Sequence, residues 1–163
     1  MRESIGALSI FSIVMTFIVL FTAYLAVSIN YANAFRVKNN LISAIENNEG
    51  INGTNTDFLN QILADQNYDT FGECPTLDKL GGDWNNATRM LIGQNDRLAR
   101  ACIYRREAEQ ASENNVKCQI SYYKVVVFFK MDLPVMGDLL TFPIKGDTRG
   151  VYDRAREDCV ETT

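Results

Sequence analysis

The sequence predicts an α+β protein in which a long N-terminal transmembrane helix continues as a spine packed on a small antiparallel β-sheet. Three observations carry this prediction. No charged side chain occurs in the 31 residues from Ser4 to Ala34, an apolar stripe at helical spacing follows them, and two late segments alternate apolar and polar residues. We expect a transmembrane helix at residues 1–35, its extracellular continuation at 36–50 and a disulfide-tied head at 51–163.

The charge-free segment is long enough to cross a membrane. Its 31 residues would form a helix of about 46 Å, whereas the hydrocarbon core of a bilayer is about 30 Å thick. A cleaved signal peptide has an apolar core of only about 7 to 15 residues. We therefore expect a retained, single membrane span.

Small residues recur along this segment near helical spacing, at Ser9, Ser12, Thr16 and Ala23. Small side chains allow helices to approach closely in an apolar medium, which would make this stripe a helix packing surface. Small residues are also common in spans without such a role, and both interpretations remain open.

The helix is predicted to continue into the head. Val37, Leu41, Ala44 and Ile45 follow i, i+4, i+7, i+8 spacing among polar residues, so one face should pack against another element. The Asn/Gly-rich residues 47–50 predict its end.

The head is expected to hold strands near 97–106, 117–131 and 139–147. In the middle strand, apolar residues alternate with a mixed set that includes lysines, which predicts a sheet with one buried and one solvated face. Pro143 places the last strand at an edge or a bulge, because proline cannot donate to a strand ladder.

Two shorter helical elements are expected before these strands. The stretch 54–66 predicts an amphipathic helix, and 84–91 a helical turn.

The four cysteines, Cys74, Cys102, Cys118 and Cys159, are widely spaced and form no C-x-x-C pair. An even number beyond a membrane span indicates two disulfides in an oxidising compartment, and hence an extracellular head. Three connectivities are possible. We favour Cys74 with Cys102 and Cys118 with Cys159, and Cys102 with Cys118 is the rival pairing.

The composition argues against several functions. The chain has no histidine, which removes most acid–base triads and zinc sites. Its net charge is −4 without a basic run, so we expect no nucleic-acid partner. Its carboxylate pairs lie in turns and polar stretches. We expect no enzyme, no cofactor, no metal site and no small-molecule substrate.

Residues 4–45 and 120–149, the latter with VVVFFKMDLPVMGD followed by FPIKGDTR, resemble the TadE-like minor pilins, or pseudopilins, of bacterial tight-adherence pilus systems. These belong to the wider type IV pilin-like superfamily. The resemblance implies a pilin-like fold, a prepilin-peptidase site after Gly6 and a mature chain beginning at Ala7. Phe11 stands where the family has a glutamate, so cleavage and retention of the leader both remain open.

The resemblance also implies a function. It suggests a structural subunit of a surface pilus or secretion-related filament with a role in cell adhesion, whose partners are membrane lipid, other pilin-like subunits and the pilus assembly machinery. The alternative is a single-pass, membrane-tethered extracellular binding or sensor module that does not polymerise.

Overall fold

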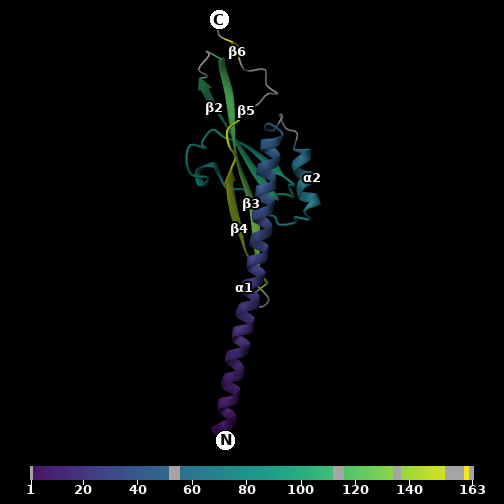
Figure 1. Ribbon diagram of the computed structural model, residues 1–163, viewed down its shortest axis with the longest axis vertical. Helices are drawn as coiled ribbons and strands as arrows, with labels where there is room; N and C mark the ends of the chain where they lie inside the picture. Colours follow the sequence, from purple (N-terminus) through teal and green to yellow (C-terminus); the bar gives the residue numbers. More distant parts are fainter. Residues whose placement is uncertain (1, 52–55, 112–115, 134–136, 153–159, 162–163) are drawn as a thin grey trace.

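The computed structural model describes residues 2–51, 56–111, 116–133, 137–152 and 160–161. A single helix forms a rod that enters a head built on a β-sheet, with the N-terminus at the far end of the rod (Figure 1). The expected α+β layout of a long apolar helix and a small antiparallel sheet is confirmed. The elements are α1 (Arg2–Asn47), α2 (Asp57–Asp65), the 3-10 turn η1 (Leu77–Lys79), β1 (Thr88–Ile92), β2 (Ala101–Ala111), β3 (Val116–Leu133), β4 (Gly137–Asp147), β5 (Val151–Tyr152) and β6 (Val160–Glu161).

The sheet is organised around β3, its longest strand. The order is β1-β2-β3-β4, and every pairing is antiparallel. Along its other edge β3 pairs in turn with β4, β5 and β6. Because β4 has no neighbour on its far side in this order, Pro143 lies on an edge strand, as its missing N–H predicts.

The C-terminal part of α1 packs on one face of this sheet. Val37, Leu41 and Ile45 are at most 3% exposed, which confirms the predicted stripe. They form one cluster with the β3 side chains Tyr123 and Val125. The helix ends at Asn47, within the Asn/Gly-rich run that predicted its stop.

The opposite face of the sheet is also covered, so the prediction of one solvated face is wrong. Val126 and Phe128 are buried there beneath the segment 74–87, which carries Trp84. Lys124 is buried on the same face, with its Nζ 3.3 Å from the Asp147 carboxylate and 4.8 Å from the ring centre of Trp84. This cover was not predictable from the sequence, because an irregular segment has no periodic pattern that indicates which face of a sheet it buries.

Two predicted elements differ near β1. The helical turn expected at 84–91 is wrong, because residues 88–92 form strand β1, paired in register with β2 so that Met90 lies opposite Ile103. The strand expected at 97–106 begins at Ala101 instead, because a turn that includes Asp96 (φ 52°) precedes it. At residues 88–92, pairing between strands outweighs the local pattern.

We predict that Leu41→Ala lowers the free energy of unfolding by about 2–5 kcal/mol, because it leaves a cavity between α1 and β3. Urea unfolding of the full chain in detergent, followed by the fluorescence of Trp84, measures this. Ser43→Ala, on the exposed side of the same helix turn, should change stability by no more than about 0.5 kcal/mol. Equal effects of the two variants would contradict the packing described.

Candidate functional site

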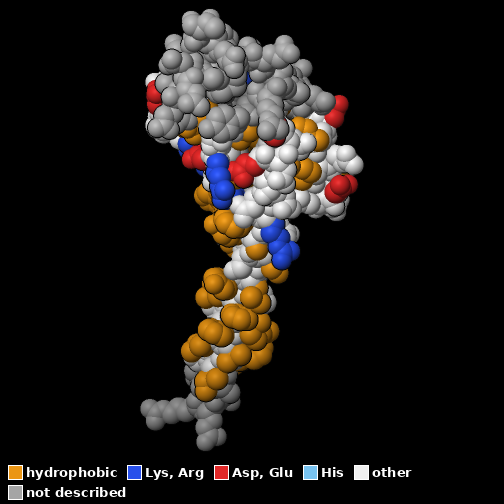
Figure 2. Space-filling model, turned by 45° about the horizontal axis from the view of Figure 1, so that its top comes forward, with side chains coloured by type: hydrophobic (Ala, Val, Ile, Leu, Met, Phe, Trp, Pro, Cys, Tyr) orange, Lys and Arg blue, Asp and Glu red, His pale blue; other side chains and the backbone are white. Residues whose placement is uncertain are grey.

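The most prominent surface is the rod, the part of α1 outside the head. Every described side chain from Leu8 to Thr22 is exposed, and most are large and apolar, such as Phe17 at 68% and Phe11 at 61%. Figure 2 shows hydrophobic side chains along the visible face of the rod and on the adjoining part of the head. By length and composition, α1 is sufficient to cross a membrane.

The small-residue stripe lies on the rod. Ser9, Ser12 and Thr16 are exposed and Ala23 is half-buried. Continuing from Ala23 in steps of seven and four residues, the same helix face reaches Asn30 and Ala34, where it meets the sheet. The stripe therefore continues the side of α1 on which the head packs.

A shallow hollow of about 310 Å³ follows part of this stripe, lined by Ser12, Ile13, Thr16, Phe17 and Leu20. The Thr16 hydroxyl donates a hydrogen bond to the Ser12 carbonyl oxygen at 2.8 Å. Its donor is thus satisfied within the helix, and the hollow can receive an apolar side chain without leaving that hydroxyl unpaired.

The predicted processing residues, Gly6 and Ala7, lie within α1 near its N-terminal end. Their side chains are outside the part of the chain that the structure describes, so cleavage between them remains a prediction.

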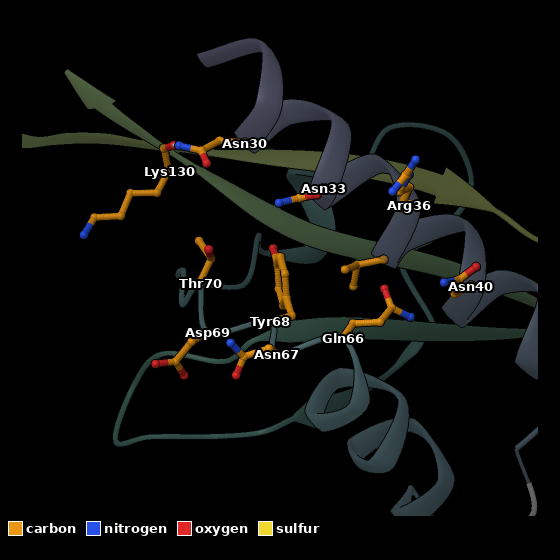
Figure 3. A pocket seen from close by; sticks show the side chains of 11 residues that line it. Asn30, Asn33, Arg36, Asn40, Gln66, Asn67, Tyr68, Asp69, Thr70 and Lys130 are labelled. Carbon is orange, nitrogen blue, oxygen red and sulfur yellow. The ribbon is translucent and has the colours of Figure 1, made fainter. Parts of the chain in front are cut away.

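A second hollow, of about 720 Å³, lies at the neck between α1 and the segment after α2. Figure 3 shows side chains of α1 on one side and residues 66–70 on the other, with Lys130 of β3 at one end. The lining is mostly amide and charged: Asn30, Asn33, Arg36, Val37, Asn40, Gln66, Asn67, Tyr68, Asp69, Thr70 and Lys130. Asp69 is ion-paired with Arg100 at 2.9 Å.

Tyr68 closes this neck hollow against the sheet. Its hydroxyl donates to the backbone oxygen of Phe128 and accepts from the Phe128 N–H at 3.0 Å. Burial raises the pKa of Tyr68 to about 12, against the lowering effect of hydrogen bonds with Phe128 and Thr70. The Tyr68 hydroxyl therefore pairs with both backbone polar groups of Phe128, as a neighbouring strand would.

One predicted disulfide is present. Cys74 and Cys102 are bonded, with a Cα–Cα distance of 5.8 Å, and this tie fastens the segment 74–87 to β2. The rival pairing of Cys102 with Cys118 is therefore wrong. The Cys118 side chain and Cys159 lie outside the described part of the chain, so their pairing remains a prediction.

The described strand register favours that second pairing. Lys117 of β3 is paired with Val160 of β6. In the sequence Cys118 follows Lys117 and Cys159 precedes Val160, so each cysteine is one residue from this described pair.

Among the described residues, no group of three or more His, Cys, Asp or Glu side chains could hold a metal ion. Comparisons with protein-family models, with characterised proteins and with solved structures found no match to this chain.

The sequence did not indicate the neck hollow. Its residues come from α1, the segment after α2 and β3, which only the folded chain brings together. The available signal was the recurrence of Asn30, Asn33 and Asn40 along α1.

We predict that Tyr68→Phe changes the alkaline stability of the protein. Between pH 10 and about 12 an unfolded chain loses the Tyr68 proton while the folded chain keeps it, so this residue makes stability fall as pH rises. Urea midpoints across this interval should fall less steeply in Tyr68→Phe. Burial also raises the pKa of Tyr104, so the stability of the variant should still fall with pH, but less steeply. Identical slopes would contradict the assignment.

We predict disulfides from Cys74 to Cys102 and from Cys118 to Cys159. Mass spectrometry of the unreduced, digested full chain should find both linked peptide pairs. A membrane-impermeant thiol reagent should label the protein only after reduction. Opening the 28-residue Cys74–Cys102 loop should cost about 3–4 kcal/mol of stability. Labelling of the native protein without reductant would refute the second disulfide.

Proposed function

We propose that this chain is a membrane-anchored assembly subunit of a bacterial surface filament, similar to the TadE-like pseudopilins. Its apolar rod packs against the rods of neighbouring subunits, and its head lies outside the cell. The observation that carries the proposal is the complete exposure of the rod from Leu8 to Thr22. So much contiguous apolar surface requires lipid or another protein to cover it.

The position of the small-residue stripe supports packing between rods. In lipid, apolar surface alone does not drive helices together, and close contact between small side chains contributes instead. Ser12 and Thr16 provide such a surface, with the Thr16 hydroxyl already hydrogen-bonded.

The disulfide supports the proposed orientation of the head. A Cys74–Cys102 bond is typical of an oxidising compartment. Since α1 enters the head directly, the head would lie on the outer side of the membrane and the N-terminus on the inner side.

A second candidate function, a tethered binding module, is favoured by the neck hollow. Arg36, Lys130 and several amides would suit a small polar or anionic ligand. In that case the rod is only an anchor and has no preferred contact face.

Oxidative cross-linking in native membranes tests the proposal. Thr16→Cys should give disulfide-linked dimers in severalfold higher yield than Val14→Cys. Val14 is two positions from Thr16 in the helix, so it lies on the opposite side of the rod at nearly the same depth. Both residues are exposed. The unsubstituted chain supplies the background from the native cysteines. Equal yields from the two variants, or no dimer from either, would favour the tethered module.

A further inference from the structure

The end of the β3–β4 pair, where β3 finishes and β4 begins, lies beside α1 (Figure 1). The Asn30 side-chain amide donates to the Lys130 backbone oxygen at 3.1 Å. The ring of Tyr31 meets the ring of Phe129 edge-on, with centroids 5.6 Å apart. Both helix residues belong to the charge-free segment, so the strand pair reaches back along the part of α1 that has no charge.

The strand pair continues past this contact toward the N-terminal end of α1. Near the end of the helix, the Ile51 N–H donates to the Tyr123 hydroxyl, whereas Lys130 meets Asn30, so β3 and α1 run in opposite directions. From Lys130, β3 extends to Leu133. At about 3.3 Å per residue, three residues add about 10 Å, which corresponds to six or seven residues of helix. The end of β3 therefore lies level with about Ala23 or Tyr24.

Apolar side chains are exposed on β4 between this end and the Asn30 contact, level with about Ser28 to Tyr31 of α1. Leu140 is 51% exposed and Phe142 is 37% exposed. They pair with Met131 and Phe129 of β3, and the rings of Phe142 and Phe129 stack with centroids 5.3 Å apart. This apolar surface adjoins that of the rod, so one surrounding medium could cover both.

The length of the rod indicates which medium this is. The stretch from Ser4 to Ala23 contains 20 residues, which as a helix extends about 30 Å and matches the hydrocarbon core of a bilayer. Tyr24 and Tyr31, 67% and 48% exposed, follow it, and tyrosines concentrate at membrane–water interfaces. A bilayer around residues 4–23 would therefore have its interface at the level of the β3–β4 end.

We propose that the end of the β3–β4 pair is a second membrane contact, in which Leu140 and Phe142 rest in the lipid interface beside α1. Since this contact requires α1 to span the bilayer, it rests on the proposed function. Lys130 lies in the same strand end, and its charge would keep its side chain at head-group depth. Two contacts instead of one would fix the rotation of the head relative to the membrane.

A lipid-quenching experiment on the full chain tests this contact. Cysteines introduced one at a time at Leu140, Leu98 and Val14 carry an environment-sensitive fluorophore, with the native disulfides left intact. Leu98 is a matched control, a leucine 44% exposed in the turn before β2. Val14 lies near the middle of residues 4–23 and reports on the span. The protein is reconstituted at low density in phosphatidylcholine vesicles with a spin label near the head group or near the chain end.

We expect the label at Leu140→Cys to be quenched severalfold more than that at Leu98→Cys, most by the spin label near the head group. The label at Val14→Cys should be quenched most by the deep one. Quenching at Val14 with none at Leu140 would overturn the second contact while leaving the span. No quenching at Val14 would overturn the span and the contact together. Shielding of Leu140 that develops only as protein density rises would show that a second copy covers this surface, and would also overturn the contact.

Discussion

One side of α1 is buried against the middle of the sheet, through Ala34, Val37, Leu41 and Ile45. The remaining elements are arranged around this contact. A Cβ atom at Gly146 would lie 2.8 Å from the Ile42 side chain, so glycine allows β4 to approach the helix closely. Because α1 is continuous from Arg2 to Asn47, the contact also fixes the direction in which the rod leaves the head.

This continuity links the fold to the proposed function. The same helix face is buried by the sheet at one end and carries small residues on the rod at the other. A neighbouring rod packed on that face would therefore have a defined position relative to the head. The charge-free segment is longer than a bilayer requires, and the β3–β4 end lies beside its excess length, so the excess need not be taken up by tilt.

Periodic features were predictable from the sequence, and features made by irregular segments were not. The helix, its buried stripe and the edge position of Pro143 follow from spacing and backbone chemistry, and the structure has all three. The cover over Val126 and Phe128 comes from a loop without a pattern, held by the Cys74–Cys102 bond. Strand β1 was missed because its pairing with β2 outweighs its local sequence. The neck hollow required three distant segments to meet.

The central claim is that the rod serves assembly as well as anchoring. Shearing surface filaments from cells that express the full chain, followed by sedimentation and intact-mass measurement of the chain in each fraction, tests it most directly. The account predicts that the chain sediments with the filaments, and the mass reports whether the bond between Gly6 and Ala7 has been cut. A chain that is found wholly in the membrane fraction, with none in the filaments, would contradict the claim.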